Sequence, residues 1–492
     1  MDQHEPTRRQ FLSGAAALSL SAGAFTTGEQ RPNVLLILSD QHRHDAAGFG
    51  GAGYANTPYL DALAKAGTLV QDAYCQIALG LPSRQSLLTG QYPSSHGAFR
   101  NRGVDFQGER TLAHDFQAAG YATAWVGKTE CNTSGFDRVI SQDDLWESFR
   151  GQNPKALLPS AKKGRPSSGS ASLRSMNLDY ADLIEGPVFH MEEHVSIHAA
   201  KLLRQPLADK PSFLVASYPS PAPPLFPPQE FLELYRDADL AFEHNYRALG
   251  SEPFRDLERR RRTSGWKSLA EKQAHNIVRA YYASVAWMDD CIGSLLTELD
   301  ASPSSRETLV IYTSSHGEQL GEHGLWQKRT LYDASTRVPL ILRWPRTIKA
   351  NQRLARVVEH LDLAASIFDL CAVKSSLDSP GRSFAPMLRG EQQEWQDRAR
   401  IELSLGPPPK SPDALLAAGV LPDAGQWALR WGEWKYIEHN PEQRALFHIS
   451  EDPKERNSRI HDPKQADRIQ AMRSMLIAGN PKRWAYSNKR GK

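Results

Sequence analysis

The chain has 492 residues, enough for one large domain and a smaller one. Hydrophobic residues make up 40% and charged residues 23%, with a formal net charge of +3, which gives no basis for nucleic acid as a partner. The one basic run, 259–262, is interpreted as a solvated face. The four scattered cysteines lack metal-type spacing and indicate neither a zinc site nor a disulfide scaffold, although one or two disulfides stay open: Cys75, Cys131, Cys291 and Cys371.

The N-terminus carries the pattern of an export signal. Arg8 and Arg9 precede a weakly apolar run over 15–20 and a small-residue site at 22–24. This order predicts a twin-arginine signal peptide over 1–24, which the export machinery recognises, and a periplasmic or secreted bacterial protein. A chance arginine pair on a tail is the alternative. No later segment has the 18 or so apolar residues of a membrane span, so we expect no membrane insertion.

The first predicted strand, 33–38, is a continuous apolar run that suits a strand buried on both faces. It leads into Asp40, at a strand end where ligands bind in open α/β sheets. A helix over 57–65 follows, with Thr57 as N-cap and Pro58 at its first position. Further along the chain we predict helices over 111–119 and 276–299 and strands over 122–126, 213–217 and 308–313.

Strands that alternate with helices predict an α/β fold with a large mixed, mostly parallel sheet flanked by helices. Residues 151–175, rich in Ser, Gly, Pro and Lys, are interpreted as a long surface loop. Later in the chain the strands become shorter and more polar, and 431–437 and 445–449 form the clearest pair. We therefore predict a main domain over 30–375 and a smaller C-terminal α+β subdomain over 376–492.

A motif in the first third of the chain identifies a family resemblance. Leu81-Pro82-Ser83-Arg84, followed by Leu87-Leu88-Thr89-Gly90, resembles the active-site signature of the sulfatase family, within the alkaline-phosphatase-like superfamily. Other matching segments lie in the family's order along the mature chain: 120–123, 127–128, 316–317, 320–326, 328–332 and 337–339. The resemblance implies the fold of a sulfatase and descent from sulfuric ester hydrolases.

The nucleophile position departs from that family. Its members carry Cys or Ser two residues before the proline of the signature, and that side chain becomes formylglycine, whose hydrated aldehyde is the nucleophile. Here the position is Gly80, which has no side chain to oxidise. We expect no formylglycine, although Gly80, Arg84, Lys128 and Lys328 occupy the places of the family's catalytic residues.

The metal position departs as well. The resemblance implies a calcium ion held by strand-end aspartates and by an Asp followed by Asn or His. Asp40 and His316 match two of these places, but Ser315 replaces the intervening Asp. Because a hard cation needs several oxygen ligands, mostly carboxylates, we expect the calcium site to be weak or lost.

The substrate-binding positions are retained more fully. Arg84, Lys128 and Lys328 match the family residues that hold sulfate oxygens, and His316 is a further candidate contact. However, Glu130 and Ala222 replace two family histidines that contact sulfate or donate protons.

Two kinds of function follow from these positions. The first is a sulfatase-family hydrolase with lost or strongly impaired formylglycine-dependent activity, unless Ser39, Ser83 or Ser315 substitutes as nucleophile. The second is a non-catalytic exported binder of a sulfated small molecule or polysaccharide. The retained residues also have plain structural interpretations: Asp40 pairs with an arginine, and His316 hydrogen-bonds a backbone carbonyl.

Overall fold

The computed structural model describes residues 31–101, 109–153, 189–204, 210–238, 240, 253–263, 270–404 and 425–478. The predicted signal peptide, 1–24, lies outside the described residues. The same is true of the predicted loop 151–175, apart from 151–153.

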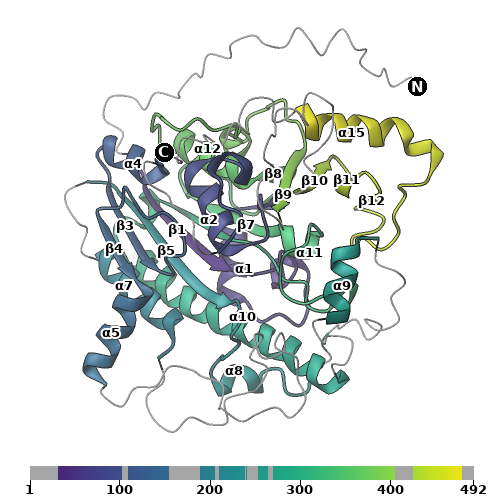
Figure 1. Ribbon diagram of the computed structural model, residues 1–492. Coiled ribbons are helices and arrows are strands. Elements are labelled where there is room, and N and C mark those ends of the chain that lie inside the picture. The colour runs from purple at the N-terminus through teal and green to yellow at the C-terminus, as the bar shows by residue number, and fades with distance from the viewer. Residues whose placement is uncertain are drawn as a thin grey trace, which may run out of the picture.

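The centre of the molecule is an eight-stranded sheet with strand order β4-β3-β5-β1-β6-β7-β2-β8 (Figure 1). Its strands are β1 (Asn33–Asp40), β2 (Thr68–Tyr74), β3 (Ala122–Gly127), β4 (Arg138–Ser141), β5 (Ser212–Pro221), β6 (Thr308–Ser314), β7 (Arg337–Arg343) and β8 (Gln352–Glu359). Neighbours pair in parallel except at β7, which runs antiparallel to β6 and β2. The predicted mixed, mostly parallel sheet is confirmed.

Helices cover both faces of this sheet (Figure 1). One face packs against α1 (Pro58–Ala66), α5 (Gln142–Gln152), α7 (Met191–Arg204) and α10 (Glu271–Asp300). The other packs against α2 (Gly80–Thr89), α4 (Leu112–Ala118), α12 (His360–Leu370) and α13 (Ala385–Leu388). Further helices are α3 (Pro93–His96), α8 (Gln229–Glu233), α9 (Arg255–Thr263) and α11 (Asp333–Thr336), with single 3-10 turns at η1 (Gly48–Gly50), η3 (Ser305–Glu307), η4 (Glu322–Gly324) and η5 (Pro463–Gln465).

The apolar run in β1 is explained by its place between these two layers. Val34, Leu36 and Leu38 pack into the hydrophobic core on one face, and Leu35 and Ile37 pack into the core on the other. Because successive side chains of a strand point to opposite faces, a strand covered on both sides must be apolar throughout.

The start of α1 differs from its prediction in one respect. Thr57 is the N-cap residue, but its hydroxyl makes no capping bond and instead accepts the backbone N–H of Gly48 at 2.9 Å. The carboxylate of Asp289 on α10 accepts the N–H groups of Tyr59 and Leu60 at 3.1 and 2.8 Å. A tertiary contact thus satisfies the free donors that the local cap was expected to take.

A smaller antiparallel sheet forms the C-terminal subdomain, in the order β12-β11-β10-β9. Its elements are β9 (Arg398–Ser404), β10 (Gly425–Trp431), β11 (Trp434–Asn440), β12 (Gln443–His448) and helix α15 (Ala466–Ala478). Met472 and Leu476 of α15 pack against the sheet, so the α+β character is confirmed. The predicted strand 431–437 is wrong at its start, because Gly432 has φ +56° and turns the chain between β10 and β11.

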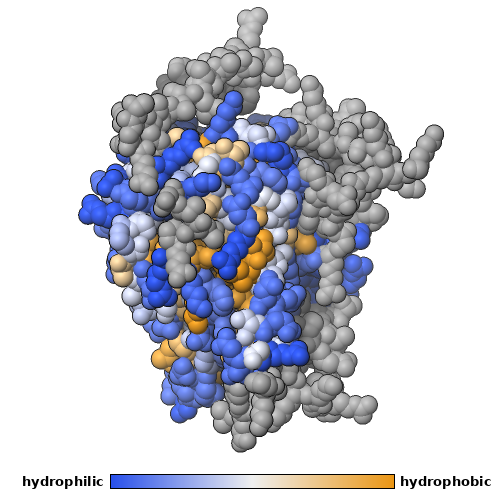
Figure 2. Space-filling model, turned by 90° about the vertical axis from the view of Figure 1, so that its left-hand side faces the viewer, coloured by the Kyte–Doolittle hydropathy of each residue, from blue (hydrophilic) through white to orange (hydrophobic). Residues whose placement is uncertain are grey.

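The side of the molecule shown in Figure 2, turned from the left of Figure 1 where β4 lies, is mostly hydrophilic with a central hydrophobic band. Val139 of the edge strand β4 is among the exposed large hydrophobic residues. Across the helices that the structure describes, none combines the length and apolar character needed to cross a membrane.

Candidate functional site

The sequence-predicted site residues meet at the carboxyl ends of the parallel strands. Asp40 ends β1, Lys128 follows β3, and Ser315 and His316 follow β6. The register pairs Asp40 with Pro221 at the end of β5, so Ala222 follows directly on the neighbouring strand. Parallel strands bring their carboxyl ends to one edge, which is why residues 275 positions apart come together there.

Helix α2 brings the signature motif to the same edge. Gly80 is the first residue of α2, and Arg84 lies one turn later on the same side of the helix. An ideal Cβ on Gly80 would stand 2.9 Å from Arg84 Nη1, 3.5 Å from Asp40 Oδ1 and 3.6 Å from Glu130 Oε2. The place of the missing nucleophile is therefore enclosed by one guanidinium and two carboxylates.

Asp40 is the hub of this group. Lys128 Nζ donates to its Oδ2 at 2.7 Å, and the Ser315 hydroxyl donates to its Oδ1 at 2.6 Å. Arg84 Nη2 and His316 Nε2 each lie 3.4 Å from the carboxylate. Burial alone raises the pKa of Asp40, but the cations, Lys128 foremost, hold that pKa well below its usual range.

Arg84 is a buried cation whose guanidinium N–H groups make no hydrogen bond among the described residues. Its side chain is fully buried, and Nε, Nη1 and Nη2 all lack a hydrogen-bond partner among the described residues. Besides Asp40, its other ion-pair partner is Glu130, at 4.0 Å. An array of buried guanidinium donors without acceptors suits a ligand that brings several oxygens.

His316 is held as a neutral ring. Its Nδ1–H donates to the carbonyl of Gly317 at 2.9 Å, as expected for a plain structural role, and its Nε2 has no hydrogen-bond partner in the described chain. Burial, followed by the charge of Lys328, lowers the pKa of His316 to about 3. The ring therefore brings no positive charge to the site at neutral pH.

Glu130 stands at the rim, where the family has a histidine. Its carboxylate lies 3.4 Å from Lys128 Nζ and is 40% exposed, whereas the Asp40 carboxylate is buried. We call Asp40, Arg84, Lys128, Glu130, Ser315, His316 and Lys328 the Asp40 cluster. Three basic side chains, Arg84, Lys128 and Lys328, face the two carboxylates of Asp40 and Glu130 in it, although burial lowers the pKa of Lys328. This composition favours binding of an anion.

Lys328 is held by a hydrogen-bonded chain of two residues that the sequence analysis did not predict, Gln41 and Glu318. Its Nζ donates to Gln41 Oε1 at 2.9 Å, and Gln41 Nε2 donates to the buried carboxylate of Glu318. Gln41 has φ +73°, an uncommon conformation for a residue with a side chain. Its place directly after Asp40 at the strand end was the available signal, whereas nothing local marks Glu318.

The basic run at 259–262 is not a uniformly solvated face, which corrects the sequence interpretation. Arg261 is buried and pairs with Glu258 at 3.0 Å. Arg260 donates to the carbonyls of Lys328 and Arg329 at 2.9 and 2.7 Å. Helix α9 therefore holds the loop that carries Lys328.

A calcium site does not fit these residues. Both oxygens of Asp40 already accept hydrogen bonds, and the Lys128 ammonium lies where a second positive charge would be repelled. Over the described ranges, no group of three or more His, Cys, Asp and Glu side chains is arranged to hold a metal ion. Ca²⁺ takes six to eight oxygen ligands, and one carboxylate with a serine hydroxyl falls far short of that.

Comparisons with known proteins agree with this fold. The family model "Sulfatase" matches residues 32–373, more than half of the chain. The chain belongs to the sulfatase family. Sulfatase relatives include an arylsulfatase of Clostridium perfringens, 27% identical with 91% of this chain and 94% of that protein covered. Another is an N-acetylglucosamine-6-O-sulfatase of Bacteroides thetaiotaomicron, 27% identical with 79% and 77% covered.

A solved structure shows that the sulfatase-family fold extends over nearly the whole chain. The phosphonate monoester hydrolase of Agrobacterium radiobacter superposes with a TM-score of 0.72 at 22% identity, covering 91% of this chain and 95% of that one. The predicted alkaline-phosphatase-like architecture is thereby confirmed. The four cysteines of this sulfatase-family chain are free thiols, so the structure pairs none of them.

Proposed function

We propose that this sulfatase-family chain has lost formylglycine-dependent hydrolysis. The observation that carries the proposal is Gly80, whose missing side chain leaves a space enclosed by Arg84, Asp40 and Glu130. Nucleophilic catalysis needs a heteroatom at that point, and glycine supplies none. Ser315 and Glu130 stand where the family has a metal carboxylate and a histidine, so further elements of the reaction are missing too.

Substitution by a nearby serine is poorly supported. Ser83 donates its hydroxyl to the carbonyl of Ser315, and Ser39 donates to the carbonyl of Thr313 at 3.2 Å. Ser315 does face a carboxylate, that of Asp40, at 2.6 Å. The pKa of Asp40 is held so low by the surrounding cations that this carboxylate is a poor general base.

We infer that the Asp40 cluster retains a second function, the binding of a sulfated small molecule or polysaccharide without cleavage. The unpartnered guanidinium nitrogens of Arg84 favour this function, because a sulfate oxygen would complete them. Lys128, directly after β3, and Lys328, on the loop that α9 holds, supply two further basic side chains. The related arylsulfatase and N-acetylglucosamine-6-O-sulfatase support sulfate esters, including those of sugars, as the ligand class.

We also propose that residues 1–24 serve as a twin-arginine signal that brings the protein to the periplasm or outside the cell. We propose further that the chain divides into a main domain over 30–375 and a C-terminal subdomain over 376–492. Arg8→Lys with Arg9→Lys should keep the protein in the cytoplasm, which cell fractionation would detect. Export of the double variant at the wild-type level would contradict the assignment.

Turnover assays test the lost activity. Purified protein should hydrolyse neither aryl sulfates nor phosphate monoesters nor phosphonates, with calcium, manganese or zinc added. Turnover that a Ser315→Ala variant loses would instead support a substitute nucleophile.

Titration of sulfated oligosaccharides tests the binding function separately. We expect the wild type to bind and Arg84→Gln to bind at least tenfold more weakly. Equal affinity of the two proteins, or no binding by either, would end this part of the proposal.

A further inference from the structure

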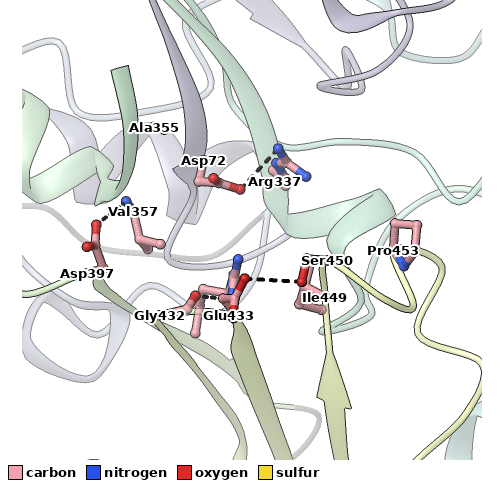
Figure 3. Close-up of a pocket in the computed structure, with 11 residues that line it drawn as sticks. Asp72, Arg337, Ala355, Val357, Asp397, Gly432, Glu433, Ile449, Ser450 and Pro453 are labelled. Atoms are coloured by element: carbon pink, nitrogen blue, oxygen red, sulfur yellow. Dashed lines mark hydrogen bonds and ion pairs between the residues drawn. The ribbon is translucent and has the colours of Figure 1, made fainter. Parts of the chain in front are cut away.

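A second candidate site lies where the C-terminal subdomain meets the large sheet. A cavity of about 440 Å³ opens there, within the roughly 300–1,000 Å³ typical of small-molecule sites. We call it the seam cavity. Its polar wall comes from β2, β7, β10 and the turns after β10 and β12, with Ala355 of β8 beside them (Figure 3): Asp72, Arg337, Arg430, Glu433 and Ser450.

Arg430 is the decisive residue of this cavity. It is 94% buried, with 6% of its surface exposed. Its Nε donates to the hydroxyl of Tyr74 at 3.1 Å and its Nη1 donates to the carbonyl of Gly432, and both acceptors are neutral. Within the described chain, Nη2 has no hydrogen-bond partner and Arg430 forms no ion pair. A nearly buried cation therefore keeps one donor for the cavity.

The other charges of the wall are already paired. Arg337 Nη2 lies 3.0 Å from Asp72, and its Nη1 makes no hydrogen bond among the described residues. In Figure 3 the side chains of these two residues point toward each other at one end of the cavity. Asp397 accepts from Arg356 at 2.9 Å, so its carboxylate is also compensated.

Glu433 and Ser450 give the cavity a polar rim. Ser450 donates to Glu433 at 3.2 Å (Figure 3), and Glu433 lies 3.6 Å from His448. These groups suit hydroxyls rather than a second anion, because a carboxylate at the rim repels further negative charge. The wall thus favours one negative charge at the arginine end and hydroxyl groups at the rim.

We propose that the seam cavity binds one oxyanion group on a polyhydroxylated molecule of monosaccharide size, either a sugar acid or a sugar sulfate. The oxyanion accepts from Arg430 Nη2 and Arg337 Nη1, and the sugar hydroxyls face Ser450 and Glu433. Guanidinium groups bind carboxylate and sulfate oxygens well without a metal. This site shares no residue with the Asp40 cluster and does not depend on the proposed function of that cluster.

Calorimetric titration of the purified protein with glucuronate, glucose 6-sulfate and glucose tests the proposal. At least one of the two anionic sugars should bind ten times more tightly than glucose, and the comparison between them tells whether carboxylate or sulfate is preferred. Equal binding of glucose, or no binding of any of the three at millimolar concentration, would overturn the proposal.

Variants locate the binding. Ala355 is an exposed wall residue, so Ala355→Trp should fill the cavity without disturbing the core and weaken binding at least tenfold. Ala301→Trp, the same change at an exposed position after α10, should leave binding unchanged. Arg430→Lys keeps the positive charge but loses the planar set of guanidinium donors, so it should also weaken binding. Binding that survives Ala355→Trp, or that Arg84→Gln abolishes instead, would place the ligand elsewhere and refute the seam site.

Discussion

Two buried charge clusters in this protein are each built on an aspartate, and they are completed differently. In the Asp333 cluster, formed by Tyr74, Asp333, Lys435 and Glu455, Lys435 Nζ lies 2.6 Å from Asp333 and 3.0 Å from Glu455. The Tyr74 hydroxyl donates to Asp333 at 2.9 Å. Lys435 therefore lies within 3.0 Å of both carboxyl groups, and burial raises the pKa of Glu455 to about 8.

The Asp40 cluster is left incomplete by comparison. It holds three basic side chains and two carboxylates, and the nitrogens of Arg84 and the Nε2 of His316 have no hydrogen-bond partner in the part of the chain described. Burying unsatisfied donors costs free energy that a purely structural cluster would avoid. Burial and charge therefore do not distinguish the two clusters, whereas the guanidinium of Arg84, with none of its nitrogens hydrogen-bonded among the described residues, does.

Removing Lys435, the cation of the Asp333 cluster, should have the largest effect on stability. Lys435→Met leaves the carboxylates of Asp333 and Glu455 buried without their partner, and we expect a loss of about 3–5 kcal/mol in the free energy of unfolding. Lys349→Met, at an exposed lysine, should change it by less than about 0.5 kcal/mol. Denaturant unfolding of both variants measures the difference. Equal stability of the two would show that the Asp333 cluster does not stabilise the fold.

Restoring a carboxylate at position 315 should convert the Asp40 cluster into a cation site. Ser315→Asp adds a second carboxylate beside Asp40, so we expect calcium at a hundredfold excess over its Kd to stabilise the variant by about 2.7 kcal/mol. The wild type and the uncharged control Ser315→Asn should show no shift in melting temperature with calcium. A wild-type shift as large as that of Ser315→Asp would contradict the assignment.

Removing the guanidinium of Arg84 should lower the affinity for ligand more than it lowers the free energy of unfolding. Arg84→Gln should lower the affinity for a sulfated oligosaccharide at least tenfold, about 1.4 kcal/mol, because the guanidinium supplies the unpartnered nitrogens. Its unfolding free energy should change by less than in Lys435→Met. Arg353→Gln, at an exposed arginine, serves as the control in both calorimetry and unfolding. A larger stability loss in Arg84→Gln than in Lys435→Met would reverse the comparison.

The neutral His316 should give a smaller, pH-dependent signal. Burial and Lys328 lower its folded-state pKa to about 3, whereas the unfolded chain takes up the proton near its ordinary pKa of about 6.5. The unfolding free energy therefore falls as the pH drops from about 6.5 toward 3, by about 1.4 kcal/mol per pH unit for this proton. His316→Gln should flatten the measured pH dependence by that one proton. An unchanged slope would show that the ring is already protonated when folded.

Much of the fold was predictable because its signals are local. The apolar run of β1, the alternation of strands with helices and the polar residues at strand ends are visible in short stretches of sequence. Parallel topology then brings Asp40, Lys128 and His316 to one edge. The family motif places Arg84 there as well.

The features that the sequence did not predict depend on contacts between distant segments. Asp289 caps α1 from α10, and Glu318 meets Gln41 across 277 positions. The seam cavity draws its wall from strands of both sheets, and no motif joins Arg337 to Arg430. Such arrangements follow from packing, which local patterns do not encode.

Gly80 also bears on whether the ancestral chemistry can return. A glycine codon can become a cysteine codon by a single nucleotide change, yet a Cβ at position 80 would stand only 2.9 Å from Arg84 Nη1. That nitrogen is the end of a flexible side chain, so a shift of the Arg84 guanidinium would make room for the new side chain. Regaining a nucleophile precursor at position 80 therefore requires one substitution and one side-chain rearrangement. Ser315, Glu130 and Ala222 would still stand in place of the family's residues, so that one substitution would not restore the whole reaction site.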